Sequence, residues 1–120
     1  MVVLDHGANR HLWRATWSPD GRRLASATGR AGNVCVWDVA TARIAHTLDA
    51  HTDVVQWVAW CPNGRRLASF GRDGMVVVWD ASVRNGLQEV LRLVTNRVYR
   101  GGLDWSPDGN LVCYAGTQAR

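Results

Sequence analysis

The sequence repeats itself at a nearly fixed interval, and this periodicity limits the possible folds more than any other feature. The segment WSPDG at 17–21 recurs as WCPNG at 60–64 and again as WSPDG at 105–109, with spacings of 43 and 45 residues. The flanking segment repeats as well, because GRRLAS occurs at both 21–26 and 64–69. Repeats of this kind bury their hydrophobic faces only by stacking on their neighbours. We therefore expect an array of similar units rather than a domain with one unique core.

Each complete unit is predicted to contain four short strands joined by tight turns. In the second unit the strands are expected at 54–60, 66–70, 75–79 and 87–94. The third strand is apolar throughout, which predicts burial on both of its faces. PNG at 62–64 and GRDG at 71–74 supply turns, since Pro presets φ and Asn-Gly tolerates positive φ. Short strands at this regular spacing predict an all-β repeat fold.

The third strand of each complete unit ends in a Trp-Asp pair, in VCVWD at 34–38 and in VVVWD at 76–80. With four predicted strands and a repeat of about 40–45 residues, the chain resembles the WD-repeat β-propeller family over essentially its whole length. The resemblance implies an all-β fold made of propeller blades, each a four-stranded antiparallel sheet.

The repeat positions divide the chain into blades. We expect 1–5 to be the last strand of a preceding blade, 6–48 blade one, 49–94 blade two and 95–120 the first two strands of blade three. A closed propeller has about four to eight blades, so we expect an incomplete, open propeller that is a fragment of a longer one. Its open blade faces expose apolar surface and favour self-association. The expected strands do not divide into groups of four, which disfavours a closed ring of copies.

The resemblance also implies a buried polar network within each well-formed blade. In blade two it comprises His51, Ser69, Asp73 and Trp79, with Trp79 N–H donating to Ser69, Ser69 bonded to His51, and His51 bonded to Asp73. Such groups need partners once they are buried. In blade one Ser26 and Trp37 match the pattern, but Ala31 stands at the turn Asp position. We interpret this network as structural, and expect blade two to be the most stable unit.

Composition excludes several enzyme classes. All 14 basic residues are Arg, so a Walker A loop and a pyridoxal Schiff base are impossible, and Glu89 is the single Glu. No G-x-S-x-G segment accompanies the Ser, His and Asp residues, which makes a hydrolase the weakest of three hypotheses. No Zn-type Cys or His spacing is present either. We therefore predict a protein that is not an enzyme and that uses no cofactor and no metal.

The favoured hypothesis is a protein-interaction scaffold, part of a larger signalling or regulatory protein. The resemblance implies docking where the first strands begin and at the second turns. The candidate residues are His11, Trp13, Arg30, Val54, Gln56, Arg72 and Tyr99. The net charge of +4 favours an acidic or phosphorylated peptide. The alternative is a nucleic-acid module in which Arg22-Arg23 and Arg65-Arg66 contact phosphates. No role could be assigned to Trp57.

The cysteines and the hydropathy of the sequence indicate the cellular compartment. Cys35, Cys61 and Cys113 are odd in number and widely spaced, which argues against a disulfide framework and favours a reducing, cytoplasmic setting. The N-terminus meets acid and His within six residues, so no signal-peptide apolar region is predicted. No apolar run approaches the ~18 residues of a membrane helix, and no membrane partner is expected.

Overall fold

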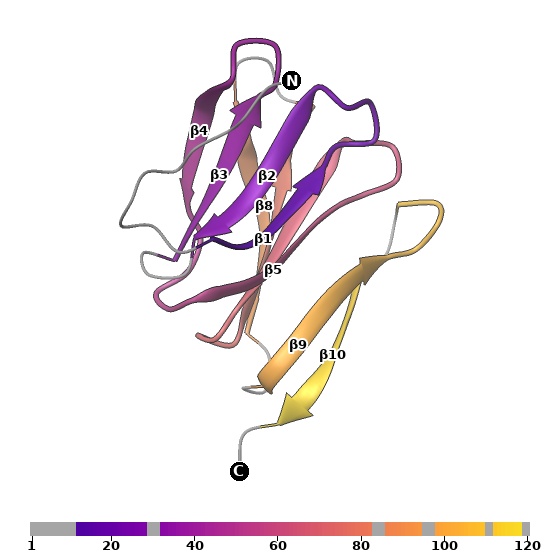
Figure 1. The fold of residues 1–120 in the computed structure, drawn as a ribbon. Coiled ribbons are helices and arrows are strands. Elements are labelled where there is room, and N and C mark those ends of the chain that lie inside the picture. The colour runs from indigo at the N-terminus through magenta and orange to yellow at the C-terminus, as the bar shows by residue number, and fades with distance from the viewer. Residues whose placement is uncertain (1–11, 29–31, 83–85, 95–97, 110–111, 119–120) are drawn as a thin grey trace.

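The computed structural model describes residues 12–28, 32–82, 86–94, 98–109 and 112–118. Within these residues the chain forms ten strands and no helix (Figure 1). The prediction of an all-β fold is therefore confirmed. The strand expected at 1–5 lies outside the described residues. None of the described segments forms a helix of the length and hydrophobicity needed to cross a membrane.

Two four-stranded antiparallel sheets and one two-stranded sheet follow one another along the chain. Blade one contains β1 (Leu12–Trp17), β2 (Arg23–Thr28), β3 (Asn33–Asp38) and β4 (Arg43–Asp49). Blade two contains β5 (Val55–Trp60), β6 (Arg66–Gly71), β7 (Met75–Asp80) and β8 (Gln88–Val94). Blade three contains β9 (Val98–Trp105) and β10 (Val112–Gln118). In both complete blades the spatial order of the strands equals their chain order.

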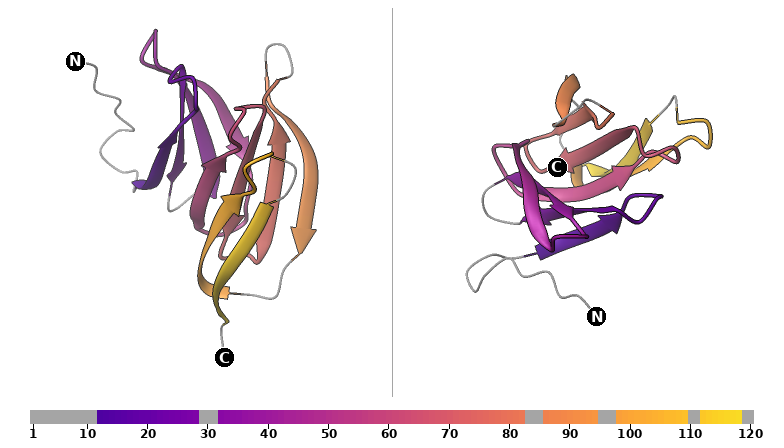
Figure 2. Two further views of the ribbon diagram at one scale, coloured as in Figure 1. Left: turned by 90° about the vertical axis from the view of Figure 1, so that its right-hand side faces the viewer. Right: turned by 90° about the horizontal axis from the view of Figure 1, so that it is seen from above.

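The sheets stack face to face with their first strands side by side. Strand β1 contacts β5, and β5 contacts β9 (Figure 2). A hydrophobic layer that includes Ala27, Val36 and Trp79 fills the space between blades one and two. A second layer, with Phe70, Val78 and Leu103, fills the space between blades two and three. Blade two is therefore covered on both faces.

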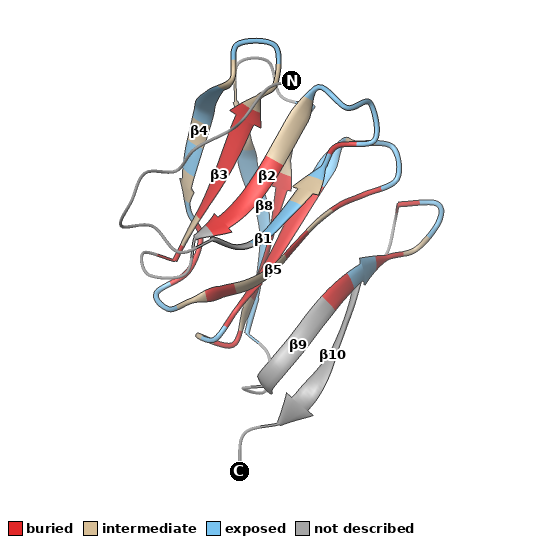
Figure 3. Ribbon diagram, in the orientation of Figure 1, coloured by how far each residue is buried: buried red, intermediate tan, exposed pale blue. Residues whose placement is uncertain are grey.

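In the two complete blades, burial decreases from the middle of the sheet to its outer edge. The central residues of β3 and β7 are all buried, as their apolar runs predict, whereas every residue of β8 is exposed (Figure 3). Leu91 and Leu93 pair with the buried Val78 and Val76, so they share the face that looks toward blade three. Blade three covers only the inner part of that face, because its described strands are β9 and β10 alone.

The same turn follows the first strand of all three blades. Gly21, Gly64 and Gly109 have φ values of 73°, 73° and 75°, a conformation that favours glycine. Each of these glycines donates its N–H to the carbonyl three residues earlier at 2.9 Å. In the first two turns Asp20 Oδ1 and Asn63 Oδ1 also accept the N–H two residues later, at 3.0 and 2.9 Å. These local bonds explain why the segment recurs with Asp or Asn before Gly.

Candidate interaction edge and the polar network beneath it

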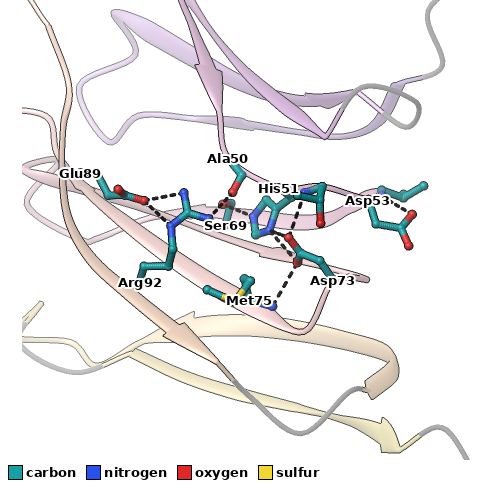
Figure 4. A network of polar contacts seen from close by, with 10 residues as sticks. Ala50, His51, Asp53, Ser69, Asp73, Met75, Glu89 and Arg92 are labelled. Atoms are coloured by element: carbon teal, nitrogen blue, oxygen red, sulfur yellow. Dashed lines mark hydrogen bonds and ion pairs between the residues drawn. The ribbon is translucent and has the colours of Figure 1, made fainter.

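A hydrogen-bonded triplet lies inside blade two. His51 Nδ1 is 2.9 Å from Asp73 Oδ1, and His51 Nε2 is 2.6 Å from Ser69 Oγ (Figure 4). Ser69 lies in β6, Asp73 in the β6–β7 turn, and His51 in the segment that enters β5. The sequence-based interpretation named these three residues as neighbours, and the structure brings them together.

The arrangement fixes the proton positions on the imidazole. A carboxylate only accepts, so Nδ1 carries a proton and donates it to Asp73, while Nε2 accepts from the Ser69 hydroxyl. Burial lowers the pKa of His51 below its ordinary value of 6.5, although the hydrogen bond to Asp73 acts in the opposite direction. The pair is therefore a neutral imidazole bonded to a carboxylate rather than an ion pair.

Backbone groups complete the network. Asp73 Oδ2 accepts from Thr52 N and Asp73 Oδ1 accepts from Met75 N, both at 3.0 Å. From β8, Arg92 Nη1 donates to the Ala50 carbonyl at 3.0 Å (Figure 4). These bonds tie the segment that enters β5 to the β6–β7 turn and to β8. The contact of Arg92 was missed by the sequence analysis, because it joins residues 42 positions apart and follows no repeat.

The two complete blades use their serines differently. In blade one, Trp37 Nε1 donates to Ser26 Oγ at 3.0 Å. In blade two, Ser69 Oγ is directed to His51, and the described contacts include no hydrogen bond between Ser69 and the buried Trp79. The two serines occupy equivalent positions in their blades. Each lies in the second strand, two residues after the leucine that pairs with the Trp of the third strand. Of the two contacts predicted for Ser69, the one with His51 is present and the one with Trp79 is not among the described contacts.

The triplet has the connectivity of a hydrolytic Ser-His-Asp triad but not its accessibility. A nucleophile must reach a substrate carbonyl and have oxyanion donors beside it. Ser69 is 0% exposed, and it lies between the buried Ala68 and Phe70. Its hydroxyl is enclosed by the packed blades, so the geometry serves to hold the segments together.

Above this network lies an edge that we call the docking edge, consisting of Val54, Gln56, Arg72, Trp13 and Tyr99. Arg72 N donates to the Val54 carbonyl at 2.9 Å, so these two residues are neighbours. Arg72 is exposed, and Val54 and Gln56 are half-buried. Trp13 and Tyr99 lie in β1 and β9. His11 and Arg30, also predicted for this surface, lie outside the described residues.

The first strand of each blade bulges at the docking edge. The pairing register skips Trp13 in β1 and Gln56 in β5, at equivalent repeat positions, and skips Tyr99 in β9, two positions further out. A bulge leaves its residue outside the regular ladder and changes the direction of its side chain. These three residues were predicted for a docking surface from the repeat, but the bulges were not predicted.

Trp57 now has a structural role. The guanidinium carbon of Arg14 lies 3.2 Å from the centroid of the Trp57 ring, a cation–π contact between β1 and β5. Arg14 and Trp57 occupy the same repeat position in adjacent blades. That equivalence is present in the sequence, and it is the signal that would have found the pair.

The opposite end of the blades carries the predicted basic residues. Arg22, Arg23 and Arg65 line a cleft of about 530 Å³ between the first turns of blades one and two. Two carboxylates alternate with these arginines. Asp20 lines the same cleft. Hydrogen bonds from the Ser82 hydroxyl and backbone N–H lower the pKa of the Asp80 carboxyl, and the nearby charges of Arg66 and Arg65 act in the same direction. Across the described residues, no group of three His, Cys, Asp or Glu side chains is placed to hold a metal ion.

Comparison with known proteins identifies the family. The sequence profile described as "WD domain, G-beta repeat" matches residues 2–38 and 42–80. The chain belongs to the WD-repeat family. Proteins of this family are commonly interaction scaffolds and are generally not enzymes.

Relatives with known names are considerably longer than this WD-repeat chain. It is 35% identical over 96 residues to the human WD repeat and SOCS box-containing protein 1, which covers 78% of the chain and 22% of that protein. It is 34% identical over 101 residues to Arabidopsis thaliana cell division cycle 20.1, cofactor of APC complex, covering 83% and 21%. The chain thus spans about a fifth of the length of these relatives.

Solved structures share the blade arrangement. A chain of the mitotic checkpoint complex matches with a TM-score of 0.79 and 25% identity, covering 94% of this chain and 34% of that one. The β-propeller domain of Myceliophteria thermophila Cps50 (Swd1) matches with a TM-score of 0.72 and 16% identity, covering 86% and 35%. The sheets therefore correspond to propeller blades, and the chain matches about a third of each of these solved chains.

Proposed function

We propose that this chain is a non-catalytic protein-interaction segment whose docking edge binds a peptide or protein surface. The observation that carries the proposal is the position of the bulges. Residues Trp13, Gln56 and Tyr99 leave the ladder of three successive first strands at one edge. Bulges are over-represented beside functional sites, where they redirect side chains. Arg72 is exposed close to the bulge of β5, and arginine is a residue type typical of interface anchors.

The polar network supports this edge mechanically. Asp73 accepts hydrogen bonds from His51 and Thr52, which fixes the segment leading to Val54. Arg72, next to Asp73, is bonded through its backbone to Val54. A surface held in its bound shape loses less conformational entropy when a ligand binds. We infer that the network acts by preorganising the docking edge rather than by chemistry.

An acidic or phosphorylated peptide is the ligand class that the charges favour. Arg72 is exposed at the tip of the β6–β7 turn, and the chain carries a net charge of +4. A guanidinium binds carboxylate or phosphate through paired hydrogen bonds. Two relatives are named as a WD repeat and SOCS box-containing protein and as a cofactor of APC complex, which supports a protein partner but says nothing of its charge.

A matched pair of arginine variants tests this proposal. Wild type is screened against an array of acidic and phosphorylated peptides, and retained peptides are measured by fluorescence anisotropy with Arg72→Ala and Arg65→Ala. We expect Arg72→Ala to weaken binding by about tenfold. Arg65→Ala, at the opposite end, is expected to bind as wild type, and both variants are expected to keep the wild-type melting temperature. Equal binding by Arg72→Ala and wild type would contradict the proposed surface.

Nucleic acid is the alternative, based on the cleft with Arg22, Arg23 and Arg65. The alternation of these arginines with Asp20 and Asp80 disfavours a continuous polyanion, because the phosphates would meet carboxylates as well as guanidiniums. Binding of a generic DNA duplex that weakens steeply with salt and is lost in Arg65→Ala would favour this alternative over the docking edge.

A further inference from the structure

The tryptophan that ends each first strand has a defined partner in the preceding blade. Trp60 Nε1 donates to the Thr16 carbonyl at 3.1 Å, and Trp105 Nε1 donates to the Ala59 carbonyl at 2.9 Å. Both indoles are enclosed, with exposures of 8% and 9%. In each case the acceptor is the residue directly before the tryptophan of the preceding blade. The contact therefore repeats with the sequence.

Trp17 is the third member of this set. The three tryptophans have the same register, since Trp17, Trp60 and Trp105 pair with the residues seven positions later. Trp17, however, is 58% exposed. Its ring is placed to pack on another blade, and no described blade lies on that side.

The other end of the array presents the matching acceptor. Asp104 directly precedes Trp105, which is the repeat position that Thr16 and Ala59 hold in the first two blades. All three residues pair with the residue nine positions later, so their backbones are equivalent. Leu103 and Trp105 are buried against blade two, while Asp104 between them is exposed. Because side chains alternate along a strand, Asp104 lies on the free face of blade three.

We propose that two copies of this chain associate head to tail, with Trp17 of one copy donating to the Asp104 carbonyl of the next. The occupant of each open face is then a blade with the same repeat, and the contact continues the two interfaces already present within the chain. Such an interface is heterologous, because different surfaces of the two copies meet. It leaves one indole and one acceptor free at the ends of the pair, so further copies add in the same way. This inference does not depend on the docking edge.

Complementary blocking variants test the proposal. Trp17→Ala removes the donor end, and Asp104→Trp obstructs the acceptor end with a bulky side chain. Sedimentation velocity of the full chain is measured from micromolar to millimolar concentration. We expect the mass of wild type to rise above the 13.3 kDa of one chain, while each variant alone stays at that mass. An equimolar mixture is expected to form a dimer and nothing larger, because it contains one intact donor end and one intact acceptor end.

Val90→Ala serves as the control, since Val90 is an exposed apolar residue of β8 in blade two and so lies on neither of the two free faces. It is expected to associate as wild type does. Circular dichroism establishes that each variant keeps its strands. A wild type that remains at one chain's mass over the whole range would overturn the proposal. Association that persists equally in Trp17→Ala, or a mixture that fails to dimerise although both variants are folded, would overturn it as well.

Discussion

Gly71 shows how closely the polar network is packed at the level of single atoms. A Cβ at this position would lie 2.5 Å from His51 Nδ1 and 2.8 Å from Asp73 Oδ1. The imidazole cannot move aside without breaking its bonds to Asp73 and Ser69. Glycine is required here by space, since its φ is not in the left-handed region.

We predict that Gly71→Ala lowers the free energy of unfolding by about 1–3 kcal/mol, the usual cost of overpacking. The matched control is Gly86→Ala, because a Cβ on Gly86 would have no atom within 4 Å. Both free energies are measured by urea denaturation followed by circular dichroism. A Gly71→Ala protein as stable as the Gly86→Ala control would show that the network is looser than its geometry indicates.

The depressed pKa of His51 gives stability a defined dependence on pH. Between the folded-state pKa and 6.5, the unfolded chain binds a proton at this residue that the folded chain does not. Stability therefore rises with pH in this window and is fully present above 6.5. Asp20 and Asp80 also have lowered pKa values, but their contributions are lost only near and below 3.8, so they do not enter the window.

We expect the melting temperature to fall as the pH is lowered from about 7.5 to about 5, with the largest change near and below the ordinary histidine pKa. His51→Gln is expected to flatten this profile, because it removes the imidazole whose pKa is lowered on folding. Differential scanning calorimetry at a series of pH values provides the comparison. A profile that His51→Gln does not alter would place the titrating group elsewhere.

At the scale of strands, the positions of the strands and turns could be predicted from the sequence, whereas the bulges, which depend on how two strands pair, could not. Strand β7 follows from five consecutive apolar residues between a Gly turn and an Asp, and its prediction at 75–79 differs by one residue from the observed end at Asp80. The Asp-Gly and Asn-Gly turns are local, so they are visible in the sequence. The bulges at Trp13 and Gln56 are not, because a bulge is a mismatch between two strands.

The residues of the polar network were predictable where they occupy positions that recur in the repeat. His51, Ser69 and Asp73 were found together because a repeat pattern relates them. The Trp79–Ser69 bond was expected on the same pattern and is not among the described contacts, although a hydroxyl that donates to His51 Nε2 keeps two lone pairs for an indole N–H, so the repeat gives the residues but not each bond. The exposure of Trp17 was also missed, since it depends on what lies across the interface rather than on the residue.

For the whole molecule, stability is expected to be unequal because repeat arrays gain it mainly from neighbouring interfaces. Blade two has a hydrophobic layer on each face, whereas the described part of blade one has such a layer on the face toward blade two. Strands β6 and β7 lie in the middle of blade two, with bonds to strands on both sides. Opening them requires both layers to separate.

We therefore predict that the amides of β6 and β7 exchange most slowly with deuterium, ahead of those of β2 and β3, when exchange is followed by mass spectrometry in dilute solution. Trp105→Ala removes the hydrogen bond to Ala59 and part of the layer between blades two and three. It should accelerate exchange in β5 to β7 more than in β2 and β3, because the layer with blade one is untouched. Equal exchange rates in the two blades, or an equal loss of protection in both, would mean that the blades unfold as one unit and that the interfaces do not act separately.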